Sequence, residues 1–238
     1  MFVTIKKKFL IIGLACVVAA LAVIGGFASV RAVSSNNLPS NGMTVVIDAG
    51  HGGWDGGVTG VNTGIRESEL NLAIARSLRH FFELHGYTVV MTRTTQEGLY
   101  GAAPQGSRKR TDMERRRVII EDASPDLVIS IHLNAFPVSS VRGAQVFFAF
   151  GACEGTRAVA TSVQSSLIAN LEATTRQAAA GDYFILDSTR YPAILVEGGF
   201  LSNPLDEALL VTAAYQERLA YAIFCGVHAL VAGGDWPW

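Results

Sequence analysis

The sequence predicts an α/β fold, a single layered domain in which helices flank a twisted, mostly parallel β-sheet. Short apolar, β-branched runs alternate with longer segments of helical pattern, which is typical of parallel strands joined by crossover helices. Half of the 238 residues are hydrophobic, so the chain can bury a sizeable core. No internal repeat interrupts the pattern, and one folded domain is the expectation for this length.

Five strands and four helices are expected along the chain. Apolar runs such as VVID and LVISI indicate strands. Strands are expected at residues 43–49, 87–93, 126–132, 144–150 and 193–198. The first helix is indicated by Leu70, Ile74 and Leu78, which are four residues apart and therefore share one face. Helices are expected at residues 67–85, 108–122, 156–171 and 213–231.

The charge of the chain limits its partners. The formal net charge is −1, and a nucleic-acid-binding domain would need a basic face, so we expect no nucleic-acid partner. One run, RKRTDMERRR at residues 108–117, is locally basic, but it contains acidic residues and precedes apolar ones. We interpret this run as the solvated face of a helix, without a role in chemistry.

The N-terminal residues differ in kind from the rest. Lysines 6–8 precede an uncharged apolar stretch at 9–30, and about 20 such residues can cross a bilayer as a helix. Positive charge before the stretch keeps that end in the cytoplasm, so the remainder is expected outside, membrane-anchored or secreted. We favour an uncleaved anchor over a signal peptide cleaved after Ala32. Residues 1–33 are thus predicted as a membrane segment, 34–42 as a linker and 43–238 as the folded domain.

Three polar side chains follow predicted strands at the points where those strands end. His51 follows VVIDAG, His132 follows LVISI, and Glu197 follows AILV. Ligands gather at the carboxyl ends of parallel strands, so these side chains are expected to share a crevice. One histidine in such a place is more often an ordinary surface residue. Two histidines after separate strands favour a functional site.

The start of the helix at 67–85 adds a carboxylate. Glu67 precedes Leu70 by three residues and lies on the same, sheet-facing side, whereas Glu69 lies on a more polar side. Two imidazoles and a carboxylate are what a catalytic zinc site needs, because three protein ligands leave a fourth position for water. A nearby carboxylate that does not bind the metal can act as general base. The sequence therefore predicts a zinc hydrolase.

Two side chains near these groups have open interpretations. Asp48 either orients a metal ligand or ends its strand in a turn. Asn134, two residues after His132, either bonds a substrate amide or caps a turn, and we expect the substrate contact.

Four segments carry a family resemblance: VIDAGHGG, RESELNLAIA, VISIHLNA and LVEGGFLSN, in this order. They resemble the ordered motifs of zinc-dependent N-acetylmuramoyl-L-alanine amidases of the Amidase_3 type. The resemblance covers residues 44–230 and implies a zinc ion held by His51, Glu67 and His132, with Glu197 as the catalytic glutamate. It also implies hydrolysis of the amide between the lactyl group of N-acetylmuramic acid and L-alanine in peptidoglycan. A single catalytic domain behind a membrane segment is most similar to the spore germination-specific type, which implies cell-wall or spore-cortex remodelling.

Two other functions stay open at this point. A zinc peptidase acting on peptidoglycan stem peptides would need an arginine near the metal to bind a carboxylate, and Arg176 is the candidate. A membrane-anchored wall-binding protein with weak catalysis is disfavoured, because all four functional positions are filled. Since no wall-binding repeat is apparent, we expect an accessory exported protein to bring the enzyme to its substrate.

Overall fold

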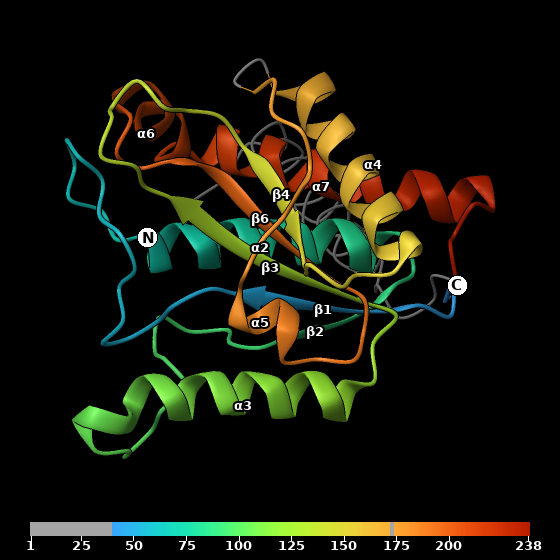
Figure 1. The fold of residues 1–238 in the computed structure, drawn as a ribbon, viewed down its shortest axis with the longest axis horizontal. Helices are drawn as coiled ribbons and strands as arrows, with labels where there is room; N and C mark the ends of the chain where they lie inside the picture. Colours follow the sequence, from blue (N-terminus) through green and yellow to red (C-terminus); the bar gives the residue numbers. More distant parts are fainter. Residues whose placement is uncertain (1–39, 172–173) are drawn as a thin grey trace, which may run out of the picture. The chain divides into compact units, whose positions relative to one another are not determined.

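Six strands form one sheet in the computed structural model, which describes residues 40–171 and 174–238 (Figure 1). The strands are β1 (Thr44–Ala49), β2 (Thr88–Met91), β3 (Leu127–Asn134), β4 (Gln145–Phe148), β5 (Ala179–Ala180) and β6 (Ala193–Phe200). Their order across the sheet is β2-β1-β3-β6-β4-β5. The five predicted strands are all present, and β5 is an addition of two residues.

The sheet is mixed, because one of its strand pairs is antiparallel. Strands β2, β1, β3 and β6 are parallel to one another, whereas β4 runs antiparallel to β6. The connection from β3 to β4 holds no helix. A parallel return needs a long crossover, so this short connection sends β4 back in the opposite direction. The mostly parallel sheet of the prediction is therefore correct except at this edge.

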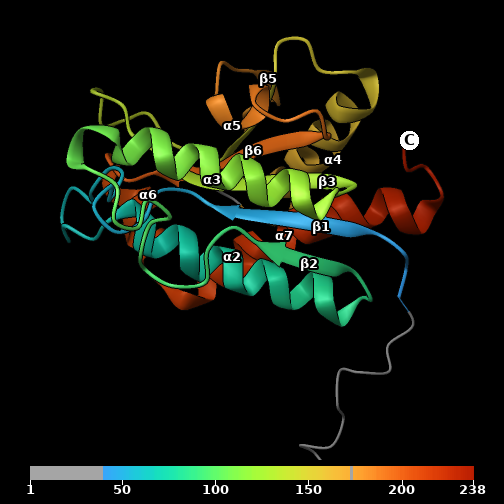
Figure 2. The same ribbon diagram turned by 90° about the horizontal axis from the view of Figure 1, so that it is seen from below.

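Helices cover both faces of the sheet (Figures 1 and 2). One face carries α2 (Glu67–Leu84), α4 (Glu154–Asn170) and α7 (Ala213–Gly233). The other carries α3 (Arg108–Ala123) and the short α5 (Phe184–Asp187). The four predicted helices are present, while α5, α6 (Pro204–Leu210) and the 3₁₀ turn η2 (Gln105–Ser107) are too short for sequence periodicity to reveal.

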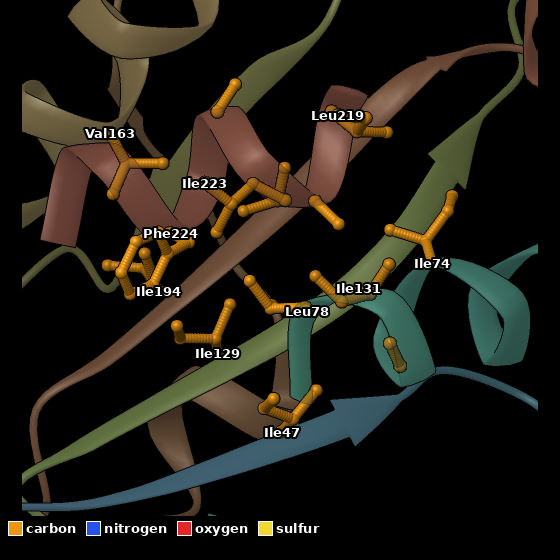
Figure 3. Packing of buried hydrophobic residues seen from close by; sticks show 14 of the residues in the cluster. Ile47, Ile74, Leu78, Ile129, Ile131, Val163, Ile194, Leu219, Ile223 and Phe224 are labelled. Carbon is orange, nitrogen blue, oxygen red and sulfur yellow. The ribbon is translucent and has the colours of Figure 1, made fainter. Parts of the chain in front are cut away.

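The main core lies between the sheet and helices α2 and α7. Ile47, Ile129 and Ile131 point from the strands toward Leu78 and Ile223 on the helices (Figure 3). All five are fully buried, and each such side chain contributes about 1.5–3 kcal/mol to folding.

The opposite face of the sheet holds a smaller core and, at the strand ends, the side chains of His132 and Glu197. Val46, Val128 and Leu195 pack there beneath α3 and α5. Side chains alternate between faces along a strand, so His132 and Glu197 lie on this same face, two residues beyond Ser130 and Leu195. The small core thus leads directly to the site at the strand ends.

The predicted membrane segment at residues 1–33 lies outside the described residues, as does most of the linker at 34–42. Within the described ranges, no helix is both long enough and apolar enough to cross a bilayer.

Candidate metal centre and active site

The structure brings His51, Glu67 and His132 together from three different elements. His51 lies in the loop after β1, Glu67 is the first residue of α2, and His132 lies near the end of β3. The Oε1 atom of Glu67 is 3.3 Å from His51 Nε2 and 3.0 Å from His132 Nδ1. The possible ligand atoms of all three residues lie within 4.8 Å of one another.

Glu67 faces inward because of its position on α2. It is 2% exposed, whereas Glu69 in the same turn is exposed to solvent. Its Oε2 accepts a hydrogen bond from the backbone N–H of Val58, and its Oε1 accepts bonds from the N–H of Leu133 and from Asn71 Nδ2. The choice of Glu67 over Glu69 from helix spacing therefore agrees with the geometry, and neighbouring groups fix the carboxylate.

Two glycines of the loop after β1 make room for the candidate ligands. A Cβ atom on Gly50 would lie 2.3 Å from His132 Nε2, and one on Gly57 would lie 2.3 Å from Glu67 Oε2. Gly57 also has a φ of +69°, a conformation that side chains with a Cβ rarely adopt. These positions need glycine because backbone and ligand side chains are in close contact.

His51 itself has an unusual backbone conformation, with a φ of 59°. Strain of this kind persists only where the surroundings hold it. Arg116 Nη2 donates a 2.6 Å hydrogen bond to the His51 carbonyl oxygen, and its Nη1 donates one of 2.8 Å to Ala49. Arg93 donates to the carbonyl oxygens of Ala49 and Gly50. Two guanidinium groups thus hold the turn that carries His51.

Arg116 corrects the interpretation of residues 108–117 as a solvated face. Its side chain is 1% exposed and pairs with Asp48 at 2.5 Å and with Asp112 at 2.6 Å. Asp48 also accepts hydrogen bonds from Thr92 and Ser130. Of the two roles open for Asp48, the structure supports the orienting one, because Asp48 acts on the His51 turn through Arg116.

The electrostatics of His51 and Glu67 suit a cation. Burial alone lowers the pKa of His51, but the carboxylates of Asp55 and Glu67 raise it to about 9. Burial raises the pKa of Glu67, but His132 and His51 bring it well below its usual range. The cluster therefore binds positive charge strongly, whether a proton or a metal ion.

The donor set also fits zinc in number and spacing. Zinc–nitrogen and zinc–oxygen bonds of about 2.0–2.1 Å in a tetrahedron place two ligand atoms about 3.3 Å apart. The separations of 3.3 Å and 3.0 Å from Glu67 Oε1 are close to this value, and all three ligand atoms lie within 4.8 Å of one another. Two imidazoles and one carboxylate are a catalytic zinc set, since structural sites use four protein ligands.

Glu197 lies beside the cluster as a buried carboxyl group. It is directly opposite His132 in the β3–β6 pairing and is 7% exposed. Its Oε2 atom is buried and has no hydrogen-bond partner in the described part of the chain. Burial raises the pKa of Glu197 to about 7, with opposing effects from His132 and Glu67. A carboxyl group that titrates near neutrality is suited to general acid–base catalysis.

The side chains of the two predicted substrate contacts make hydrogen bonds within the chain. The side chain of Asn134 accepts a hydrogen bond from the N–H of Ala135. Arg176 donates to the carbonyl oxygen of Arg142 and to Gln145 Oε1, and its guanidinium packs over the ring of Phe200. Substrate binding by Asn134 and Arg176 stays a prediction.

A cavity of about 190 Å³ adjoins the cluster, on the face of the sheet that α3 and α5 cover. It is lined by His51 and His132 and also by Arg108, Tyr183 and Trp54, with other residues of α3 and α5. Sequence patterns did not indicate Arg108 or Tyr183, because each lies at the start of a helix whose position over the strand ends depends on the tertiary fold.

Comparisons with known proteins agree on the family. Residues 45–229 match the family described as N-acetylmuramoyl-L-alanine amidase. The chain is 37% identical over 198 residues to a germination-specific N-acetylmuramoyl-L-alanine amidase of Bacillus subtilis, covering 80% of this chain and 81% of that protein.

Solved structures give the same result. A CwlD amidase from Clostridioides difficile, solved in complex with the GerS lipoprotein, aligns with a TM-score of 0.77 and 31% identity. The alignment covers 80% of this chain and 99% of that one. An N-acetylmuramoyl-L-alanine amidase from Clostridium difficile 630 aligns with a TM-score of 0.73 and 30% identity, over 81% of this chain and 98% of that one. The chain therefore belongs to the N-acetylmuramoyl-L-alanine amidase family, and it is a hydrolase that acts on peptidoglycan.

Proposed function

We propose that the chain cleaves the amide between the lactyl group of N-acetylmuramic acid and L-alanine with Glu197 as general base, beside a zinc ion held by His51, Glu67 and His132. The observation that carries this proposal is the buried Oε2 atom of Glu197, which has no hydrogen-bond partner among residues 40–171 and 174–238 and lies next to a cluster with the composition of a catalytic zinc site. A buried carboxyl oxygen without a partner is costly to fold, so its presence favours a chemical role.

A zinc ion, when bound, would supply a Lewis acid that lowers the pKa of water and polarises the scissile carbonyl. Glu197 accepts the proton that the attacking water loses as the carbon–oxygen bond forms. It then donates this proton to the nitrogen of L-alanine as the carbon–nitrogen bond breaks. The products are the lactyl carboxylate and the free amino group of the peptide. A pKa of about 7 suits one carboxyl group to both transfers.

Digestion of purified peptidoglycan tests the reaction. Mass spectrometry is expected to find muramic acid with a free lactyl carboxyl group and peptides with a free L-alanine amino terminus. Products cut within the stem peptide would instead indicate the peptidase that was the alternative from sequence.

The Glu197→Gln variant tests the role of this residue, because the amide is nearly isosteric but cannot take up the proton. The variant is expected to keep its zinc and its fold and to lose 10²- to 10⁴-fold in kcat. Loss of zinc would make Glu197 a ligand, and near-normal turnover would remove it from the mechanism.

The place of action follows from the N-terminal sequence. We propose that residues 9–30, after lysines 6–8, anchor the enzyme with its catalytic domain outside the cytoplasm. Cell fractionation and sequencing of the mature N-terminus test this, and a soluble protein beginning near Val33 would contradict it.

The similarity to a germination-specific amidase supports a role in the spore cortex. Deletion of the gene is expected to leave growth unchanged and to block germination, and normally germinating spores would contradict the role. The relative solved with a lipoprotein supports the expected accessory exported protein. That expectation predicts weak hydrolysis of intact wall by the enzyme alone, and vigorous unaided hydrolysis would contradict it.

A further inference from the structure

We infer that the cavity beside His51 and His132 receives the stem peptide of the substrate, and that Arg108 pairs there with a carboxylate of this peptide. The inference rests on the proposed function, since it names the part of the substrate that lies on one side of the scissile amide.

The position of the cavity connects it to the chemistry. His51 and His132 line the same cavity as Arg108, Tyr100 and Tyr183. A ligand that occupies the cavity is therefore in contact with the candidate metal ligands. A glycan strand continues on both sides of each muramic acid, whereas a stem peptide is short and ends. A partly enclosed cavity of about 190 Å³ suits the short peptide better than the polymer.

Arg108 differs from Lys109 and Arg116, the other cationic residues of the cavity, in its ion pairing. Lys109 pairs with Asp55 at 3.2 Å, and Arg116 is paired with Asp48 and with a second aspartate, so both charges are compensated. Within residues 40–171 and 174–238, no carboxylate lies within ion-pair distance of Arg108. Its Nε atom only makes a long contact of 3.4 Å with the carbonyl oxygen of Ala103. Its charge is thus available to a carboxylate of the substrate.

The guanidinium of Arg108 is held in place by the loop that carries His51. It lies over the ring of Tyr100, 5.3 Å from the ring centre. The Tyr100 hydroxyl in turn accepts a 2.8 Å hydrogen bond from the N–H of Trp54, three residues after His51. The binding group and the metal cluster are therefore fixed relative to each other, which lowers the entropic cost of binding a ligand that spans both.

Local helix stability does not account for Arg108. The first turn of α3 contains three consecutive basic residues, 108–110, and no acidic one. Positive side chains at a helix N-terminus are unfavourable, and positions that break a local rule are often functional. Arg176, the candidate carboxylate-binding arginine of the alternative peptidase, contacts Arg142 and Gln145 and does not line this cavity.

The experiment uses the zinc-loaded full-length protein and two soluble probes. One is N-acetylmuramoyl tripeptide with free carboxylates, and the other is the same compound with its peptide carboxylates amidated. Arg108→Gln removes the charge, and Arg108→Lys keeps it. Arg110→Gln is the matched control, because Arg110 lies in the same helical turn, is exposed and does not line the cavity.

Arg108→Gln is expected to raise KM for the free-acid probe about tenfold with little change in kcat, as for loss of a charged hydrogen bond. On the amidated probe it should match the wild type, and Arg110→Gln should match the wild type on both probes. Arg108→Lys should recover part of the loss. Equal losses on both probes would indicate a structural role and overturn the inference, as would no loss at all.

Calorimetry with the free stem tripeptide gives a readout that does not need turnover. The Kd is expected to rise about tenfold in Arg108→Gln and to stay unchanged in Arg110→Gln. If the wild type hydrolyses neither probe, the proposed function fails, but the tripeptide measurement still decides the inference. Equal binding by the wild type and Arg108→Gln would refute it.

Discussion

Arg116 is the residue whose replacement should reveal how the fold supports the site. Its guanidinium is 1% exposed, pairs with Asp48 and Asp112, and donates hydrogen bonds to the carbonyl oxygens of Ala49 and His51. Arg116→Gln removes the positive charge and most of the donors. We expect this variant to lose both stability and zinc affinity.

The loss in the free energy of unfolding follows from the groups that Arg116→Gln leaves without a partner. Burial alone raises the pKa of Asp48, but Arg116 and two hydroxyl groups lower it to about 2 from 3.8, which corresponds to about 2 kcal/mol. The two hydrogen bonds to carbonyl oxygens contribute about 1 kcal/mol each. Removing one partner of a buried ion pair costs about 3–5 kcal/mol, and a loss of this size in the free energy of unfolding is expected for Arg116→Gln. Because His51 loses its backbone contact, zinc affinity should fall about 10- to 100-fold.

Urea denaturation and zinc titration measure the two effects, with Arg117→Gln as the control. Arg117 is the next residue of α3, and it pairs with Glu114 on the surface. Surface pairs contribute at most about 1 kcal/mol, so this control should stay close to the wild type. If Arg116→Gln were no less stable than Arg117→Gln, or bound zinc equally well, the buried network would not support the site.

Three further predictions concern the same region. Single alanine substitutions at the three candidate ligands should abolish stoichiometric zinc in metal analysis, and retained zinc would refute the assignment. Gly50→Ala should weaken zinc binding by displacing His132. Gly106→Ala is the control, because its added methyl group would meet no atom within 4 Å. Equal zinc affinities of the two variants would argue against the close contact between Gly50 and His132. Since Asp48 has a folded pKa below its unfolded value, its stabilisation is present above about pH 4 and is lost as the pH falls toward 2. Other carboxylates also titrate in acid, so the prediction concerns the difference: in an acid titration, the loss of stability over this window should be about 2 kcal/mol smaller in Asp48→Asn than in the wild type, and parallel curves would contradict it.

Much of the fold was predictable because the central strands are continuous apolar runs, separated by segments with a helical pattern. The run VVID ends in Asp48 and the run LVISI leads to His132, and each pattern places apolar side chains toward α2 and α7. The antiparallel course of β4 was not predictable from its own residues. The apolar run at residues 144–150 is compatible with either strand direction. The direction is decided by the connection from β3, which is too short to contain a crossover helix.

The candidate metal site was predictable because its members obey two simple rules. His51, His132 and Glu197 follow strands, and Glu67 lies on the buried side of its helix. The burial of Arg116 was not predictable in this way. The charged run around it resembles any solvated helix surface, and Arg116 is buried because it pairs with the buried Asp48 on β1. A sequence pattern describes one element at a time, whereas this pair joins two.

Because successive side chains of a strand point to opposite faces of the sheet, the site is sensitive to strand register. A slip of one residue in β3 would exchange the faces of its side chains, placing His132 in the main core and Ile131 at the site. Contacts beside the site oppose such a slip. Glu67 Oε1 accepts a hydrogen bond from the N–H of Leu133, and the N–H of Gly50 donates to the carbonyl oxygen of Ile131. Glu67 and the loop after β1 therefore hold the register of β3, so metal binding at the proposed site and the alignment of the sheet should stabilise each other.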